Sequence, residues 1–301
     1  MEDLISLADL TTEEVLGLLD LADELKRKQH AGESYQPLKG RTLAMIFEKP
    51  SLRTRLTFET GIYQLGGLGI FYPTTLGERE SVPDVARNLE RWVDGIVART
   101  YKHDSVVQLA QYASVPVINA LTDKLHPCQI LADAQALREK KGDFRNLKLT
   151  FVGDGNNVLH SWMNFAAKVP LNLTLVCPEG YECDPDIYAY ARHEAKGRVT
   201  VTHDLQAGLA GADAVYTDVW ASMGQEAESE KRKKVFAPYR VDAKVMAMAK
   251  KDAIFMHCLP AHRGEEVTDE VLDGPRSIVF DQAENRLHAQ KAVMVTLMKR
   301  D

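Results

Sequence analysis

The residues most suited to chemistry form a short run of hydroxyl and guanidinium side chains, Ser51-Leu52-Arg53-Thr54-Arg55. The run follows an apolar stretch at residues 42–47, which is typical of a buried strand, and it opens a helical pattern. Free backbone N–H groups at a helix N-terminus, the helix dipole and guanidinium forks all favour phosphate oxygens. The run therefore predicts a phosphate site, with a capped helix start carrying surface arginines as the alternative.

Further polar side chains follow strand-like stretches in the same half of the chain. Arg99 comes after residues 95–98, and the motif His126-Pro127-Cys128-Gln129 opens another helical pattern. His126 and Gln129 lie three positions apart, so both can face one ligand, and together they offer the donors and acceptors that suit a planar amide. Arg99 would hold an oxygen shared between phosphate and amide. A capping or core histidine is the alternative for His126.

In the second half of the chain, Gly153-Asp154-Gly155-Asn156-Asn157 follows a strand-like run and opens a helix. It is similar to the dinucleotide fingerprint, but Val158 stands where the third glycine belongs, and no acid closes the next strand. A nicotinamide-dependent dehydrogenase is therefore the weaker interpretation. An amide of Asn156 or Asn157 at this helix start suits a carboxylate or an ammonium group.

Three more positions complete the candidate residues. Asp218 precedes Ser222-Met223-Gly224 and suits a ligand ammonium, although a lone aspartate is commonly a turn or cap residue. His257-Cys258-Leu259-Pro260 follows a strand, and its cysteine is either a nucleophile or a small buried hydrophobe. Arg286, at the start of the last helix, would return a cation to the site. Residues 222–234 are interpreted as a mobile lid or as a solvated helix face.

The order of the elements predicts an α/β fold with two domains, each a parallel sheet with helices on both faces. A capping box, Thr11 with Glu14, starts the first helix. Strands are expected at residues 42–47, 69–72, 95–98, 115–120, 147–152, 173–177, 199–202, 214–217, 253–257 and 277–280. Helices are expected at residues 52–65, 82–92, 105–113, 127–141, 158–169, 187–195, 205–210 and 285–299. The predicted domains are residues 1–142, on which the terminal helix 285–301 packs back, and residues 143–284.

Composition excludes several classes of protein. The net charge of −6 and the lack of a basic stripe argue against a nucleic-acid partner. No apolar run reaches membrane-spanning length, and the acidic start resembles no secretory signal. The four cysteines show neither disulfide-framework nor metal-site spacing. We therefore expect a cytoplasmic protein with no membrane partner.

Taken together, four motifs resemble the transcarbamylase family, and the resemblance covers essentially the whole chain. Ser51-x-Arg53-Thr54-Arg55 is similar to the family's carbamoyl-phosphate signature, and His126-Pro127-Cys128-Gln129 to its second shared motif. Asp218-x-x-x-Ser222-Met223-Gly224 and His257-Cys258-Leu259-Pro260 resemble the segments that mark the members acting on ornithine. The joint match is specific, although each motif alone is not.

The resemblance implies a role for each candidate residue. The carbamoyl phosphate ligands would be Ser51, Leu52, Arg53, Thr54, Arg99, His126, Gln129, Cys258, Leu259 and Arg286. Ornithine would be held by Asn157, Asp218, Ser222 and Met223. Catalysis would involve Arg99, His126, Asp218, Cys258 and Arg286.

The resemblance also implies a homotrimer with active sites between subunits. Two positions depart from the family's pattern. Leu52 stands where a threonine is common, so one hydroxyl donor is lost while the backbone N–H remains. Thr75 stands where many relatives carry a longer side chain that reaches a neighbouring subunit.

The implied reaction transfers the carbamoyl group of carbamoyl phosphate to the δ-amine of L-ornithine, giving L-citrulline and phosphate. Carbamoyl phosphate is already activated, so neither a metal nor an organic cofactor is expected. N-acetylornithine, putrescine and aspartate are the alternative amines, and a phosphate-binding module without catalysis is a further alternative. The sequence favours arginine biosynthesis but leaves the direction open.

Overall fold

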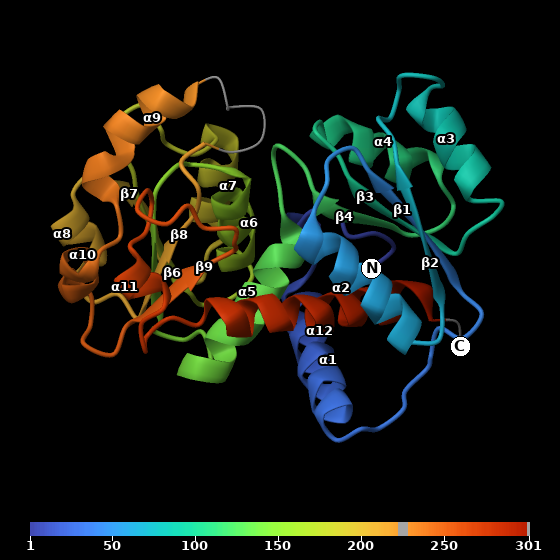
Figure 1. Cartoon of the computed structure of the whole chain (residues 1–301), viewed down its shortest axis with the longest axis horizontal. Coiled ribbons are helices and arrows are strands. Elements are labelled where there is room, and N and C mark those ends of the chain that lie inside the picture. Colours follow the sequence, from blue (N-terminus) through green and yellow to red (C-terminus); the bar gives the residue numbers. More distant parts are fainter. Residues whose placement is uncertain (222–227, 300–301) are drawn as a thin grey trace. The chain divides into compact units, whose positions relative to one another are not determined.

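The computed structural model describes residues 1–221 and 228–299, which form two compact units built on parallel sheets (Figure 1). Residues 1–135 with 284–299 form the first unit, and residues 136–283 form the second. The four-stranded sheet of the first unit has the order β2-β1-β3-β4, and the five-stranded sheet of the second has the order β7-β6-β5-β8-β9. The predicted α/β class with two parallel sheets is confirmed.

The helices and strands follow one another with short connections. The first unit contains η1 (Leu7–Asp9), α1 (Thr12–His30), β1 (Thr42–Phe47), α2 (Leu52–Gln64), β2 (Leu68–Pro73), α3 (Val82–Leu89), β3 (Gly95–Arg99), α4 (His103–Tyr112) and β4 (Val117–Leu121). The second contains β5 (Lys148–Val152), α6 (Asn157–Ala166), β6 (Asn172–Val176), α7 (Pro185–Glu194), β7 (Val199–Thr202), α8 (Leu205–Leu209), β8 (Ala214–Thr217), α9 (Ser229–Phe236), η3 (Ala237–Tyr239), α10 (Ala243–Met248), β9 (Ile254–His257) and α11 (Asp269–Leu272). Residues of both units belong to α5 (Pro127–Lys141) and α12 (Val279–Met298).

Helices cover both faces of the first sheet. Ile46 and Ile96, from the two central strands, pack with Ala86 of α3 and Leu109 of α4. Strand side chains alternate between faces, so the buried Met45 points to the opposite side, where α2 lies (Figure 1). The strands are therefore apolar on both faces, as expected for a parallel sheet.

Helix α12 packs closely on α2 within the first unit. A Cβ at Gly61 of α2 would lie 2.9 Å from Met294 and 3.2 Å from Lys291 of α12. Glycine is thus the residue that allows this close approach. The approach brings the first turns of α2 within reach of side chains on α12.

Each sheet has one point at which the strand order reverses. In the first unit it lies between β1 and β3, and in the second between β5 and β8. Ligands of open α/β sheets bind beyond the carboxyl ends of the strands at such points. The loops after β1, β3, β5 and β8 are the segments that begin at Glu48, Thr100, Gly153 and Asp218.

Most predicted elements are present, with ends that differ by at most three residues, except that α12 begins six residues before the predicted start at 285. The capping box of Thr11 and Glu14 is confirmed. The strand predicted at 277–280 is wrong, because only Ser277 makes a bridge, to Phe255, and α12 already begins at Val279. Arg286 consequently lies two turns inside α12 rather than at its start. Helices α10 and α11 were not predicted.

Among the described residues, no helix is both long and apolar enough to cross a membrane.

Candidate active site

The start of α2 has the geometry of an anion site. Pro50 ends the extended segment after β1, and Ser51 caps the helix by accepting a hydrogen bond from the N–H of Thr54, at 3.3 Å. Leu52, the first residue of the helix, is 71% exposed, so its backbone N–H is not covered by its own side chain. Free N–H groups of this first turn are the groups that bind phosphate at other helix N-termini.

The loops after β1 and β3 are tied to each other at the reversal of the strand order. The N–H of Glu48 donates to the carbonyl of Arg99 at 2.9 Å. The Glu48 carboxylate accepts from the N–H of Tyr101 at 2.6 Å and from the N–H of Leu76 at 2.9 Å. Glu48 therefore fixes the backbone at Arg99 and directly after it, a role that the sequence did not indicate.

Arg286 joins three of the predicted residues in the first unit. Its guanidinium donates to Thr54 Oγ1 at 3.1 Å and to Gln129 Oε1. Gln129 in turn donates from Nε2 to Asp133 Oδ1 at 2.8 Å, which sets the direction of the amide. All of these side chains are buried. The structure thus brings together Thr54, Gln129 and Arg286, which the sequence places on three different helices.

His126 lies close to several positively charged side chains. Burial lowers the pKa of His126 well below its usual value, and the charges of Arg286, Arg99 and Arg53 lower it further. The imidazole is therefore neutral at physiological pH and can both donate and accept hydrogen bonds. Three guanidinium groups near one neutral imidazole give this part of the first unit a positive charge.

A pocket of about 680 Å³ opens beside the start of α2. Its lining includes Ser51, Leu52 and Arg55 of the helix, Glu48 before it and Thr75 after β2. Arg55 stacks on Phe71, with 3.7 Å between the guanidinium carbon and the ring centre. The pocket reaches the predicted phosphate-binding turn from the side of β2.

In the second unit, Asp218 is the centre of a hydrogen-bonded cluster at the reversal of strand order. Cys258 donates its thiol to Asp218 Oδ1 at 3.0 Å, and Asn156 donates to Asp218 Oδ2 at 2.7 Å. The N–H of Val219 also reaches Oδ1 at 2.8 Å. The carboxylate is thus held in one orientation by loops that follow β5, β8 and β9.

Asn156 and Asn157 have different positions. Asn156 caps α6 by accepting from the N–H groups of Val158 and Leu159, and its amide nitrogen binds Asp218. Asn157 is buried at the first position of the helix. The sequence offered either asparagine as the amide that meets a ligand. The hydrogen bond by which Asn156 supports Asp218 could be found only in the structure.

The loop that carries Cys258 is held by a buried pair, His257 and Glu266. His257 Nδ1 accepts from the N–H of Leu259 at 2.8 Å, so its proton lies on Nε2, which is 3.2 Å from Glu266 Oε1. Leu259 has a φ of 57°, a conformation that side chains rarely adopt and that the surrounding contacts must maintain. Glu266 was missed by the sequence analysis because an isolated glutamate in a loop carries no signal.

A second buried pair holds α9 to the loop after β5. Arg232 binds Asp154 at 3.0 Å and also donates to the carbonyl of Trp220 at 3.0 Å. Burial raises the pKa of Asp154 to about 6, although Arg232 acts against this rise. The predicted ligands Ser222 and Met223 lie outside the described residues, between Trp220 and α9. Residues 229–234 of the predicted lid belong to helix α9.

The remaining cysteines are unreactive by environment. Burial raises the pKa of Cys128 and of Cys177 to about 12, and that of Cys183 to about 11. Cys128 instead donates to the carbonyl of Asn119 at 3.3 Å. Cys258, half-buried and bound to Asp218, is the cysteine placed for a role in ligand binding.

Comparisons with known proteins match this arrangement over both units. Residues 2–139 match the family model described as the carbamoyl-P binding domain of aspartate/ornithine carbamoyltransferase, and residues 145–297 match its Asp/Orn binding domain. The chain belongs to the aspartate/ornithine carbamoyltransferase family. The fold and the four motifs of this carbamoyltransferase thus agree with the resemblance found in the sequence.

Several relatives are similar over nearly their whole length. An ornithine carbamoyltransferase of Syntrophus aciditrophicus is 52% identical, with 99% of each chain covered. One of Thermococcus kodakarensis is 53% identical, over 98% of this chain and 96% of the relative. The solved ornithine carbamoyltransferase from Pyrococcus furiosus superposes with a TM-score of 0.96 at 49% identity, over 99% of this chain and 97% of that one.

Proposed function

We propose that the protein is an ornithine carbamoyltransferase, which forms L-citrulline and phosphate from carbamoyl phosphate and L-ornithine in arginine biosynthesis. The observation that carries this proposal is that each unit holds a polar site, and that the two sites differ in charge. Three guanidinium groups surround His126 in the first unit, and a carboxylate is bound to a thiol, Asp218 to Cys258, in the second. The names of the relatives support ornithine as the amine.

Carbamoyl phosphate is assigned to the first unit. Ser51, Leu52, Arg53 and Thr54 bind the phosphate through side chains and backbone N–H groups of the first turn of α2. Arg286 reaches the same turn through Thr54. Arg99, His126 and Gln129 bind the carbamoyl group, whose carbonyl and amine match the donors and acceptors of these side chains.

Ornithine is assigned to the second unit. Asp218 binds an ammonium group of the substrate, and Asn157 together with Ser222 and Met223 completes the ornithine site. Cys258 and Leu259 contribute from the loop after β9, where Cys258 fixes the carboxylate of Asp218. A carboxylate held in one orientation is well suited to bind a substrate ammonium group.

The reaction follows from these assignments. The neutral δ-amine attacks the carbamoyl carbon, and negative charge develops on the carbonyl oxygen. Arg99, His126 and Thr54 donate hydrogen bonds to that oxygen as it becomes charged. The bond from the carbamoyl carbon to the bridging oxygen then breaks, and phosphate leaves with Arg53 and Arg286 beside it and accepts the proton of the amine.

Positioning is the larger part of this catalysis. The electrophile is already activated, so the protein contributes by holding both substrates in line. Correct alignment of two reactants can lower a barrier by roughly 7–11 kcal/mol. The buried network of Arg286, Thr54 and Gln129 fixes side chains that bind carbamoyl phosphate, the carbamoyl donor of this alignment.

The decisive experiment offers carbamoyl phosphate with ornithine, N-acetylornithine, putrescine or aspartate and detects the ureido product. Product with ornithine alone supports the proposal. Product with another amine keeps the assignment of carbamoyl phosphate and overturns that of Asp218. The Asp218→Asn variant keeps the size of the side chain but removes its charge, so it should retain carbamoyl phosphate binding and lose ornithine use.

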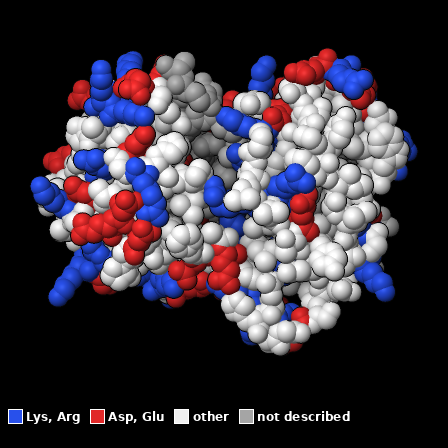
Figure 2. Space-filling view, viewed as in Figure 1, with Lys and Arg blue, Asp and Glu red and all other residues white. Residues whose placement is uncertain are grey.

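We further propose that the protein assembles as a homotrimer. Strand β2 is at the edge of its sheet, and its outer side has no partner strand among the described residues. Exposed apolar side chains gather on α2 and β2: Leu52, Leu56, Tyr63, Leu68, Ile70 and Tyr72. Figure 2 shows that the part of the surface carrying these elements has few charged side chains. A patch of this kind marks an interaction surface.

Light scattering after gel filtration tests the assembly. The wild-type chain should elute with the mass of three chains, and the double variant Tyr63→Lys, Ile70→Lys should dissociate. Trp92→Lys is a matched control, because Trp92 is 70% exposed but lies outside α2 and β2. A monomeric wild-type protein, or a double variant that stays trimeric, would contradict the proposed interface.

A further inference from the structure

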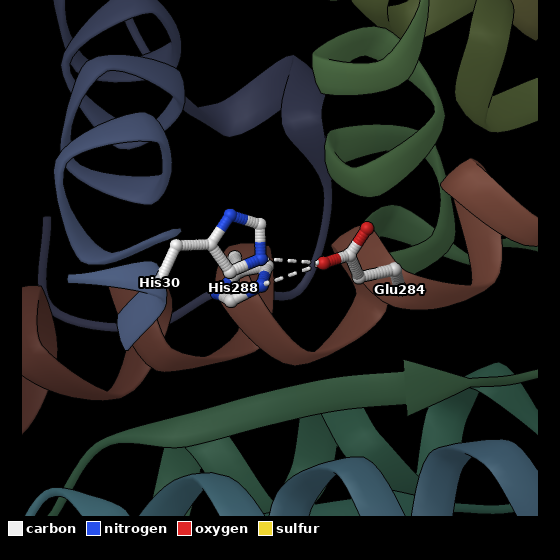
Figure 3. Close-up of side chains that lie close together, drawn as sticks. All are labelled: His30, Glu284 and His288. Carbon is white, nitrogen blue, oxygen red and sulfur yellow. Dashed lines mark hydrogen bonds and ion pairs between the residues drawn. The ribbon is translucent and has the colours of Figure 1, made fainter. Parts of the chain in front are cut away.

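Three side chains of the first unit converge away from the candidate active site. His30 is the last residue of α1, and Glu284 and His288 lie one turn apart on α12 (Figure 3). Glu284 Oε1 lies 2.9 Å from His30 Nε2 and 3.9 Å from His288 Nε2. Their ligand atoms all lie within 4.8 Å of one another. Figure 3 shows both imidazoles directed at the same carboxylate oxygen.

The second observation is the state of His288. Its side chain is fully buried, and neither ring nitrogen makes a hydrogen bond to the described residues. A buried polar group without a partner is costly, and a native protein that keeps one commonly uses it for an ion or a ligand.

The charged groups around the cluster leave one carboxylate oxygen for an ion. Lys26 lies 3.4 Å from Oε2, the other oxygen of the Glu284 carboxylate, and donates to Asn285 at 2.8 Å. Lys291 is directed to Gln29, at 2.7 Å. The negative end of the α1 dipole at His30 adds a favourable field for a cation.

We propose that His30, Glu284 and His288 form a binding site for a divalent transition metal ion of the zinc class. Two imidazoles and a carboxylate are a common ligand set for such ions. Bonds of about 2.0–2.1 Å in tetrahedral geometry place ligand atoms about 3.3 Å apart. The observed separations of 2.9 and 3.9 Å lie on either side of that value, so small side-chain rotations suffice.

A metal ion at this site would cross-link α1 and α12. The fourth coordination position would be open to water. His30 and His288 are separated by most of the chain, so a shared metal ion ties the first helix to the last. Binding to the folded state alone raises the unfolding temperature with metal concentration. The proposal does not depend on the transfer reaction, because none of these residues is assigned to either substrate.

Titration with Co²⁺ tests the site, because tetrahedral Co²⁺ has strong visible absorption bands and reports its ligands. We expect the wild-type protein to bind one equivalent per chain with such bands, and its unfolding temperature to rise. The cluster of Asp218, His257 and Cys258 is a competing site with a thiolate ligand. A cobalt site there would show a thiolate charge-transfer band in the near ultraviolet, which the proposed site lacks.

His30→Ala is the main variant, since the His30 side chain is 59% exposed and its removal should leave the fold intact. We expect its metal affinity to fall at least tenfold. His193→Ala is the matched control, because His193 is also exposed and lies 2.7 Å from a glutamate, Glu194, but has no third ligand among the described residues. His288→Ala, checked for folding by circular dichroism, should abolish the visible bands.

Unchanged cobalt binding in both His30→Ala and His288→Ala would overturn the proposal. Absence of visible bands from the wild-type protein at millimolar Co²⁺ would do so as well. Equal loss of affinity in His193→Ala and His30→Ala would show surface binding instead of a defined site. Loss of cobalt affinity in His30→Ala and His288→Ala, with the affinity of His193→Ala unchanged, supports the proposal.

Discussion

The thiol of Cys258 donates to the carboxylate of Asp218, with 3.0 Å between Sγ and Oδ1, although 40 residues separate them in the chain. Asn156 binds the other oxygen of the same carboxylate from a third loop. The three loops follow adjacent strands, β9, β8 and β5, where the strand order of the second sheet reverses. A ligand cation meeting Asp218 therefore finds a carboxylate whose orientation is already fixed.

Replacing Cys258 tests how far this orientation matters. Cys258→Ala removes a hydrogen bond to a charged group, so KM for ornithine should rise by about tenfold to a hundredfold. Cys258→Ser keeps a hydrogen-bond donor, so KM for ornithine should rise less than in Cys258→Ala. KM for ornithine should still rise more than KM for carbamoyl phosphate. Steady-state kinetics with each substrate varied in turn would measure both effects. An equal rise of both KM values would contradict the role of Cys258 in orienting Asp218 for ornithine.

Arg99 provides a test of the proposed stabilisation of the carbonyl oxygen. It ends β3, and its charge is one of those that lower the pKa of His126. Loss of a donor to a developing oxyanion costs a factor of about 10²–10³ in kcat. We expect Arg99→Ala to lose that much turnover and to keep its far-ultraviolet circular dichroism. Arg91→Ala is the control, since the Arg91 side chain is 77% exposed. Near-normal turnover of Arg99→Ala would exclude its role in the oxyanion site.

Much of this organisation could be predicted from the sequence, because it depends on local patterns. The parallel strands are continuous apolar runs, and Ser51 and Thr11 are cap residues with their partners three positions away. The error at residues 277–280 has a local cause as well. Ile278, Val279 and Phe280 are residue types that favour strands. In the structure, however, they follow the single bridge made by Ser277, and helix α12 begins at Val279.

Contacts between distant segments could not be predicted in the same way. Arg286 and Thr54 are 232 residues apart, and they meet because α12 packs on α2 at Gly61. Glu266 and Asn156 act on other site residues, and nothing in their local sequence shows which ones. The resemblance to a family named the residues of the site, whereas the residues that support them had to come from the structure.

The buried state of His126 predicts a pH dependence of stability. Its pKa in the folded protein is depressed, so its contribution to stability is complete above the unfolded value of about 6.5 and is lost as the pH falls. Relative to His126→Asn, the wild-type free energy of unfolding should fall by about 1.4 kcal/mol per pH unit below 6.5 while the folded imidazole stays neutral. Urea unfolding of both proteins between pH 5 and 8 measures the difference, and parallel curves would show that folding does not perturb His126.

Glu266 is predicted to position the loop of Cys258 without touching a substrate. Its carboxylate, buried like the side chain of His257, accepts from the N–H of His262 at 2.5 Å and lies 3.2 Å from His257 Nε2. Glu266→Gln keeps the shape of the side chain but weakens both contacts, so the free energy of unfolding should fall by roughly 1.5–3 kcal/mol.

The functional consequence should be specific to ornithine. Because His257 holds the N–H of Leu259, loosening His257 should displace the neighbouring Cys258 and raise KM for ornithine while KM for carbamoyl phosphate stays constant. Glu265→Gln is the matched control, since this neighbour is partly exposed and pairs with Lys233 instead. If Glu266→Gln lost stability without any change in KM for ornithine, Glu266 would serve the fold alone and not the position of Cys258.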